Sequence, residues 1–474
     1  MSAPHAHAGS GEPSPGVLDL VGIGFGPANL ALAIAVAEHN AASAAHDGLR
    51  SAFIERQDRF SWHPGMLLEG ATMQVSFLKD LVTQRNPSSP YSFLHYLREH
   101  GRLADFINQK TFFPTRVEFH DYLRWCAEDF TAQTVYGTEV TGIRPVPDTP
   151  GDGPVDVLEV ACGPAREPGR DRDRPLRTRN VMLGTGLRPR LPEGVRAGPR
   201  IWHNSELLHR TRALTGPLRH RRFAVVGAGQ SAAEVADHLH RAFPGAQVCA
   251  VFTRYGYSPA DDSPFANRIF DPEAVDAFFG APEEVKRGLL DYHGNTNYSV
   301  VDGELIEQLY RTVYQEKVTG TERLRILNAS ELTGVAEQPD GVRATVRSLL
   351  TGATEPLLCD AVVYATGYRA ADPRELLGAL GDECLTDGQG RLRIGRDHRI
   401  ATTSRVRAGI YVQGAATEHS HGITSSLLST LAVRSGEIRD SLLLHGAERA
   451  VRADRAPDGP PPEPAAVLPA GHRS

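Results

Sequence analysis

Gly24-Phe25-Gly26-Pro27-Ala28-Asn29 decides the fold of the N-terminal part of the chain. The apolar run Val17 to Val21 precedes it and predicts a strand, and the Ala/Leu-rich residues 28–37 that follow predict a helix. A glycine turn between a strand and a helix is typical of a dinucleotide-binding βαβ unit. Gly24 would permit the tight turn. Gly26 would let backbone N–H groups approach a pyrophosphate at the positive end of the helix.

Three other residues bear on this first nucleotide site. Glu55 ends the next predicted strand, Ser51 to Ile54, where a carboxylate can accept hydrogen bonds from a ribose hydroxyl. Pro27 stands at the start of the helix, while Asn29 occupies the position of the usual third glycine. The alternative is a glycine turn without a ligand, but the strand, the helix and the acid together favour a nucleotide site.

The same pattern recurs about two hundred residues later. Gly227-Ala228-Gly229-Gln230-Ser231-Ala232 lies between a predicted strand, Phe223 to Val226, and a predicted helix, Ser231 to Arg241. The following strand, Gln247 to Phe252, leads to Arg254 and not to a carboxylate. A cation at this position favours the 2′-phosphate of NADPH over the bare ribose of NADH, although Arg254 could also be a solvated loop residue.

Two such units predict an α/β protein with two Rossmann-like dinucleotide-binding domains, one for FAD and one for NADPH. The absence of a CxxC motif argues against a disulfide reductase. Later apolar strands at 361–365 and 409–413 suggest that the FAD domain resumes after the NADPH domain, and is therefore discontinuous. The expected divisions are a disordered leader at 1–16, the first part of the FAD domain at 17–205, the NADPH domain with a substrate-binding segment at 206–335, the second part of the FAD domain at 336–448 and a disordered Pro-rich tail at 449–474.

Composition excludes several classes of protein. The 474 residues are 41% hydrophobic and 23% charged, as in a globular enzyme of two or three domains. A net charge of -6 argues against a nucleic-acid partner. The five cysteines are scattered singly, so we expect no metal site and a reducing, cytoplasmic location. The N-terminus lacks a signal sequence and no apolar run is long enough to cross a bilayer, so we expect no membrane anchor.

Four further stretches resemble the siderophore-type amine N-hydroxylases, and specifically the L-ornithine monooxygenases. The likeness extends from about residue 17 to about residue 444, and the stretches that carry it are Met73-Gln74-Val75-Ser76-Phe77-Leu78-Lys79-Asp80-Leu81, Asp261-Asp262-Ser263-Pro264-Phe265-Ala266-Asn267, Asn295-Thr296-Asn297-Tyr298 and His421-Gly422-Ile423-Thr424-Ser425-Ser426-Leu427-Leu428-Ser429.

The resemblance implies an NADPH-dependent flavin monooxygenase that hydroxylates the side-chain amine of L-ornithine through a flavin 4a-hydroperoxide, with NADP+ retained during turnover. The other substrate would be dioxygen, and N-hydroxyornithine would serve hydroxamate siderophore or related biosynthesis. A homotetramer or homodimer is also implied. No catalytic protein nucleophile is expected, because the flavin carries the chemistry. The alternatives are a lysine N-hydroxylase and a flavin monooxygenase that oxidises a sulfide or a ketone.

The resemblance also implies the substrate site. Lys79 would bind the substrate carboxylate, Asn267 and Asn297 would hydrogen-bond the carboxylate and the α-amine, and Ser429 would lie near the reacting end. These groups suit a zwitterion, because a further buried anion would hold the reacting amine in its protonated form. The alternatives are an ordinary surface pair of Lys79 with Asp80, and asparagines that only form turns.

The remaining expected residues surround the cofactors. Met73 and Gln74 would lie against the flavin and Trp62 and His63 would flank it, although Trp62 could be a core residue. Arg116 would contact the adenine half of FAD or only a nearby carbonyl. Thr366-Gly367 resembles a linker between the domains, unless Gly367 only forms a turn, and Gly414 ends the late strand. The full set of expected cofactor-binding residues is Gly24, Gly26, Pro27, Asn29, Glu55, Trp62, His63, Met73, Gln74, Arg116, Gly227, Gly229, Gln230, Ser231, Arg254, Thr366, Gly367 and Gly414.

Overall fold

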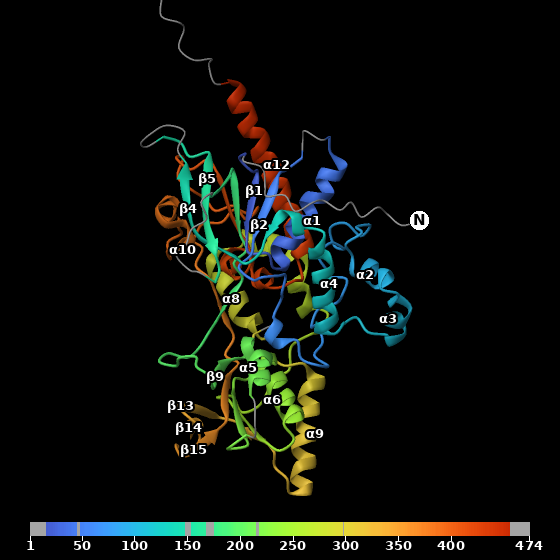
Figure 1. The fold of residues 1–474 in the computed structure, drawn as a ribbon, viewed down its shortest axis with the longest axis vertical. Helices are drawn as coiled ribbons and strands as arrows, with labels where there is room; N and C mark the ends of the chain where they lie inside the picture. The colour runs from blue at the N-terminus through green and yellow to red at the C-terminus, as the bar shows by residue number, and fades with distance from the viewer. Residues whose placement is uncertain are drawn as a thin grey trace, which may run out of the picture.

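The protein folds into two lobes, each built around a parallel sheet (Figure 1). The computed structural model describes residues 16–44, 48–146, 153–166, 175–214, 218–296 and 298–455. The predicted leader, apart from Gly16, and most of the predicted tail therefore lie outside the described residues.

The first lobe contains a five-stranded parallel sheet in the order β18-β7-β1-β2-β3. The strands β18, β7 and β1, which are neighbours in this sheet, are buried at every position. Helices cover one face of the sheet and a second sheet covers the other. The bounds of the strands in this order are Gly409–Val412, Asn180–Leu183, Leu20–Ile23, Ser51–Ile54 and Thr134–Val135.

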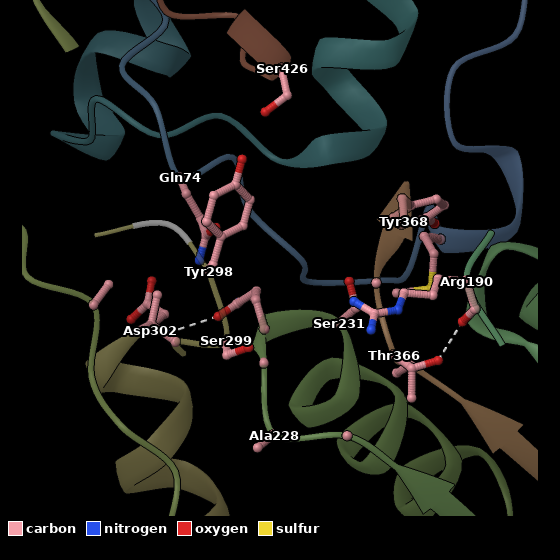
Figure 2. Close-up of a pocket in the computed structure, with 18 of the residues that line it drawn as sticks. Gln74, Arg190, Ala228, Ser231, Tyr298, Ser299, Asp302, Thr366, Tyr368 and Ser426 are labelled. Atoms are coloured by element: carbon pink, nitrogen blue, oxygen red, sulfur yellow. Dashed lines mark hydrogen bonds between the residues drawn. The ribbon is translucent and has the colours of Figure 1, made fainter. Parts of the chain in front are cut away.

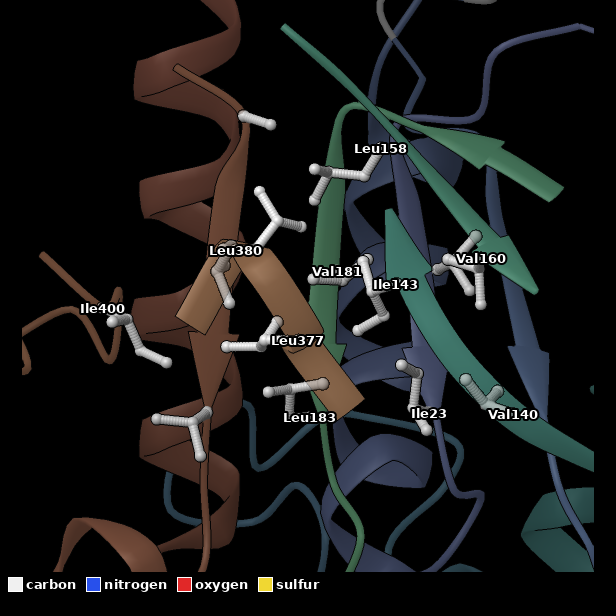
Figure 3. Packing of buried hydrophobic residues seen from close by; sticks show 14 of the residues in the cluster. Ile23, Val140, Ile143, Leu158, Val160, Val181, Leu183, Leu377, Leu380 and Ile400 are labelled. Carbon is white, nitrogen blue, oxygen red and sulfur yellow. The ribbon is translucent and has the colours of Figure 1, made fainter. Parts of the chain in front are cut away.

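Two layers cover this sheet. On one face lie α1 (Pro27–Ala42) and the long α12 (Leu431–Arg455). The other face packs against an antiparallel sheet of β4 (Thr138–Val146), β5 (Val157–Pro164) and β6 (Leu176–Thr178). Figure 3 shows this second interface, where side chains of β1 and β7 meet those of β4, β5 and α10 (Arg374–Leu377).

The second lobe contains a parallel sheet in the order β12-β11-β10-β16-β9. One face packs against α6 (Gln230–Ala242) and α9 (Gly303–Thr319), and the other against the antiparallel sheet β13-β14-β15. The bounds of the parallel strands in the order given are Leu324–Leu327, Gln247–Val251, Arg222–Val226, Ala361–Tyr364 and Ile201–His203, and those of the antiparallel strands are Ser330–Gln338, Gly341–Ser348 and Thr354–Cys359.

Two strands of the second sheet lie outside the predicted boundaries of 206 and 336. The strand Ala361–Tyr364 was expected in the resumed first domain, but it pairs with Arg222–Val226, and Ile201–His203 joins at its other side. The chain passes between the lobes through a two-stranded antiparallel ribbon, β8 (Leu187–Pro189) and β17 (Tyr368–Ala370). An apolar run alone does not say which neighbour it pairs with, so the boundary prediction was wrong here.

The C-terminal helix extends into the predicted tail. The tail was expected to begin at 449, whereas α12 continues to Arg455. No helix in the described ranges is long and apolar enough to cross a membrane. The remaining α-helices are α2 (Phe93–Glu99), α3 (Leu103–Gln109), α4 (Arg116–Glu128), α5 (Leu207–Ala213), α7 (Pro272–Gly280), α8 (Glu283–His293) and α11 (Glu418–His421).

Candidate active site between the lobes

The two glycine turns are built alike. Gly24 has φ +80°, and a Cβ there would lie 2.5 Å from the carbonyl oxygen of Gly184. Gly227 has φ +139°, and a Cβ there would lie 2.4 Å from the carbonyl oxygen of Ala365. Neither position can accept a side chain without a backbone shift. Each turn therefore lies directly against the residue that follows a neighbouring strand of its own sheet.

Open space lies over the first turn, at the carboxyl edge of the sheet. A Cβ at Gly26, Gly186 or Gly414 would meet no atom within 4 Å, and these glycines follow the adjacent strands β1, β7 and β18. Ligands of open α/β sheets bind at this edge. Sequence reasoning missed Gly186, although Thr185-Gly186 repeats the Thr366-Gly367 pair after a buried strand.

Asn29 and Glu55 hold the first turn in place. Asn29 Nδ2 donates to the carbonyl oxygens of Ile23 (3.2 Å) and Gly24 (2.6 Å), and the side chain is 1% exposed. Glu55 accepts the N–H of Phe25 at 2.7 Å. The residue in place of the usual third glycine is thus an asparagine whose side-chain amide donates hydrogen bonds to the backbone of the turn.

A large cavity separates the lobes beside the second turn. Its volume of about 2370 Å³ exceeds the roughly 300–1,000 Å³ of an ordinary ligand pocket, so it has room for more than one ligand. Figure 2 shows Gln74 and Ser426 of the first lobe and Ala228 and Ser231 of the second bordering this cavity. The expected site residues that line it are Trp62, His63, Met73, Gln74, Lys79, Arg116, Gly227, Gly229, Gln230, Ser231, Arg254, Asn267, Thr366, Gly367 and Ser429.

Other expected residues lie elsewhere. The first glycine turn, with Pro27 and Asn29, is absent from the cavity lining, as are Glu55 and Gly414. These residues surround the carboxyl edge of the first sheet instead. Asn297 lies outside the described residues, so its expected role stays a prediction.

Lys79 extends into the cavity from the loop before α2. Its Nζ lies 5.8 Å from the centre of the Phe270 ring. Partial burial lowers the pKa of Lys79, and the negative charge of Asp271 opposes that shift. A cation in this position is available to a ligand carboxylate.

The neighbouring Asp80 points the other way, into the protein. It is 3% exposed and accepts the backbone N–H groups of Val82 (3.0 Å), Thr83 (2.7 Å) and Phe93 (2.8 Å). The alternative of a Lys79–Asp80 surface pair is therefore wrong. Asp80 stabilises the loop that carries Lys79 by accepting these hydrogen bonds. The dipeptide Lys-Asp does not indicate this role.

Asn267 and Ser429 line the same cavity from segments far apart in the sequence. Asn267 belongs to the short 3-10 helix Ala266–Phe270, and its Nδ2 donates to the carbonyl oxygen of Asp262 at 2.8 Å. Ser429 is 1% exposed, and its Oγ has no hydrogen-bond partner among the described residues. A buried hydroxyl without a partner at a cavity wall favours a ligand that completes its bonding.

Tyr298 and Glu418 form a hydrogen bond in the cavity wall. This contact was not predicted from the sequence. The Tyr298 hydroxyl donates to Glu418 Oε1, and both residues line the cavity. Burial raises the pKa of Glu418, and the hydrogen bond from Tyr298 opposes that rise. The pair joins the segment after α8 to the start of α11. Both residues fall in or beside stretches noted for their family resemblance, but their 120-residue separation hides the pairing.

The turn that carries Trp62 and His63 forms part of the cavity wall where the lobes meet, because Trp62 packs against the core of the first lobe and Met66 in that of the second. His63 adopts φ +48°, and its ring centre lies 5.0 Å from that of Trp62. Burial, with the positive charge of Arg116, lowers the pKa of His63 to about 4. Arg116 donates to the carbonyl oxygen of Met66 at 3.0 Å, so the expected contact with a nearby carbonyl is present.

The wall on the side of the second lobe contains the remaining expected residues. Arg254 is exposed at the cavity and donates to the carbonyl oxygen of Ser299 at 2.7 Å. The Thr366 hydroxyl donates to the carbonyl oxygen of Arg190, a contact drawn in Figure 2. Within the described part of the chain, no group of three or more His, Cys, Asp or Glu side chains could hold a metal ion.

Comparison with known proteins identifies the family. Residues 16–370 match the sequence profile of the L-lysine 6-monooxygenase/L-ornithine 5-monooxygenase family. The chain is 44% identical over 432 residues to the L-ornithine N(5)-monooxygenase of Burkholderia cepacia, an alignment that covers 90% of this chain and 94% of the relative.

The chain belongs to this family.

Solved structures agree with that membership. The ornithine N-hydroxylase of Kutzneria sp. 744, with reduced FAD, NADP+ and L-ornithine, superposes with a TM-score of 0.84 at 47% identity, covering 92% of this chain and 100% of that one. The L-lysine 6-monooxygenase of Pseudomonas syringae gives a TM-score of 0.77 at 33% identity, covering 92% and 100%. The predicted architecture of two Rossmann-like dinucleotide-binding domains, the first of them discontinuous, is confirmed.

Proposed function

We propose that this protein is an NADPH-dependent flavin monooxygenase that hydroxylates the side-chain amine of L-ornithine. The observation that carries the proposal is the inter-lobe cavity, which Lys79, Asn267 and Ser429 line together with the second glycine turn. Identity of 44% to an L-ornithine N(5)-monooxygenase over 90% of the chain supports the same substrate.

The residues fit the two cofactors. The open space over Gly26, Gly186 and Gly414 suits an extended dinucleotide on the first sheet, and we assign FAD there. The second turn and Arg254 line the cavity and suit NADPH, whose 2′-phosphate would take the guanidinium. When bound, FAD that NADPH has reduced supplies the activated oxygen for the hydroxylation.

The protein's own side chains would bind and orient the amino acid. Lys79 offers one positive charge for the carboxylate, and Asn267 offers neutral hydrogen-bonding groups. The reacting amine has a pKa near 10.4 in water and no lone pair while protonated, so it must lose its proton before it attacks oxygen. Glu418 also lines the cavity, and its carboxyl group accepts the Tyr298 hydroxyl.

Further features of the proposal concern the setting of the reaction. Dioxygen would be the second substrate, NADP+ would remain bound as part of the cavity wall, and N-hydroxyornithine would serve hydroxamate siderophore or related biosynthesis. We expect a cytoplasmic homotetramer or homodimer.

Lysine is the second candidate substrate. The family includes lysine 6-monooxygenases, and the solved lysine enzyme shares 33% identity with this chain. Ornithine and lysine differ by one methylene, which contributes only about 1–3 kcal/mol of selectivity. Distinguishing them therefore needs a direct measurement.

The test is mass spectrometry of the product after incubation with FAD, NADPH, oxygen and either amino acid. The expected result is a product heavier by one oxygen atom with ornithine, and mainly hydrogen peroxide with lysine. Efficient hydroxylation of lysine and not of ornithine would show that lysine is the substrate. No hydroxylated amino acid in either reaction would refute the proposal.

A further inference from the structure

A buried ion pair joins the two lobes beside the cavity. Arg116 begins α4 in the first lobe, and Glu234 lies one turn into α6 in the second, 118 residues away. The guanidinium binds the carboxylate through two parallel contacts, Nη1 to Oε2 at 2.9 Å and Nη2 to Oε1 at 2.8 Å. The side chains are 14% and 7% exposed.

Each partner is also bonded to a segment that faces the cavity. Arg116 Nη1 donates to the carbonyl oxygen of Met66, at the end of the turn that carries Trp62 and His63; the Met66 side chain packs in the core of the second lobe. On the second lobe, Gln230 Nε2 donates to Glu234 Oε1 at 3.0 Å. The pair therefore connects that aromatic turn with the second glycine turn.

The glutamine extends this network to the start of α9. Gln230 follows Gly229 directly, and its Oε1 accepts the N–H of Asp302 at 2.8 Å. Asp302 also lines the cavity and caps the helix that follows it. One carboxylate thus helps to fix two segments of the second lobe against the first.

The geometry of the pair fixes an orientation as well as a distance. A planar guanidinium that makes two parallel bonds to a carboxylate loses both if either group tilts. Because Glu234 is buried and Arg116 is only 14% exposed, separation of the pair would leave Glu234 with an unpaired charge in a poorly solvated place. The lobes are therefore held in one relative orientation at this point.

We infer that Arg116 and Glu234 are positioning residues that set the second glycine turn against the Trp62–Met66 turn, and so set the path for hydride transfer from NADPH to FAD. In that step NADPH would give up a hydride and become NADP+, and the flavin would take up that hydrogen together with its two electrons. The inference rests on the proposed function and goes beyond it, because neither residue is then needed to touch the amino acid.

Two variants and a matched control test this inference. Glu234→Gln keeps the shape of the side chain and removes its charge, and Arg116→Lys keeps the charge and removes the two-bond geometry. The control is Glu355→Gln, because Arg325 and Glu355 form a pair with the same two-contact geometry, at 2.8 and 2.9 Å, but are more exposed and both lie in the second lobe.

The main measurement is the limiting rate of anaerobic flavin reduction at saturating NADPH. A misplacement of about 1 Å can slow a positioned reaction roughly 100-fold, so we expect losses of roughly 10- to 100-fold in both variants. The KM for ornithine and the FAD content should stay within about twofold of the wild type, and Glu355→Gln should match the wild type in all three quantities.

A second readout does not depend on turnover. Hydrogen–deuterium exchange of the FAD-loaded protein should become faster at the start of α4 and of α6 in Glu234→Gln, and not in Glu355→Gln. The exchanged pair, Arg116→Glu with Glu234→Arg, should recover part of the reduction rate. This recovery is the deciding result if a single variant fails to retain FAD.

Three outcomes would overturn the inference. They are a wild-type limiting rate with unchanged exchange in Glu234→Gln, a loss of NADP+ affinity without a loss of limiting rate, and no recovery in the exchanged pair. The second outcome would assign Arg116 to the dinucleotide phosphates instead. Failure of the proposed function looks different, because the wild-type protein would then reduce its flavin and yield no hydroxylated ornithine.

Discussion

Replacement of Lys79 by methionine tests the substrate site most directly, because it removes the charge and keeps most of the side-chain volume. A hydrogen bond to a charged group is worth about 1.5–3 kcal/mol. Lys79 is only partly buried, so solvent screens its charge and the lower half of that range applies. About 1.5–2 kcal/mol corresponds to a rise of roughly 10- to 30-fold in the KM for ornithine.

The assay is steady-state formation of the hydroxylated product with ornithine and NADPH varied in turn. The KM for NADPH should change less than about twofold, because Lys79 lies in the loop of the amino-acid site. Lys286→Met is the matched control: its Nζ lies 5.8 Å from the centre of the Phe278 ring, as Lys79 lies from Phe270, but Lys286 does not line the cavity. Equal increases in both KM values, or an unchanged KM for ornithine, would refute the assigned role.

Three further predictions concern Gly229, Asp80 and His421. Gly229→Leu should abolish flavin reduction by NADPH and leave FAD bound, because a Cβ there already lies 3.3 Å from Ser299 Cα; reduction at the wild-type rate would contradict the second nucleotide site. Asp80→Ala leaves two buried N–H groups and one partly buried N–H group without their acceptor. It should lower the free energy of unfolding by about 3 kcal/mol, as measured by urea denaturation, and Asp80→Asn should lose less. Burial lowers the pKa of His421 to about 4, below its unfolded value near 6.5, so stability present above pH 6.5 is lost as the pH falls toward 4. The loss should be about 1.4 kcal/mol at pH 5.5, and a His421→Phe variant that keeps the full loss would disprove this source.

Local patterns predicted the elements that depend on nearby residues. The strand Ser51–Ile54 has the predicted bounds, and both glycine turns lie between a strand and a helix as expected. These features follow from apolar periodicity and from the backbone freedom of glycine, which act over a few residues.

Pairings between distant residues were not accessible in this way. The composition of Ala361–Tyr364 predicts a buried strand but does not say to which lobe it belongs. Its pairing with β10 places it in the second lobe. Arg116 and Glu234 follow no motif, since an ion pair depends on two orientations that the fold sets. The inward direction of Asp80 likewise depends on three backbone groups elsewhere in its loop and in α2.

The ribbon of β8 and β17 makes the second lobe an insertion. Pro189 and Tyr368 are register partners, so the chain leaves the first lobe and comes back to it at neighbouring points. Such an arrangement lets a whole module be added, removed or exchanged between relatives without re-routing the host. Nicotinamide specificity can therefore change by exchange of the inserted segment, provided that its contacts with the first lobe, such as Arg116–Glu234, are kept.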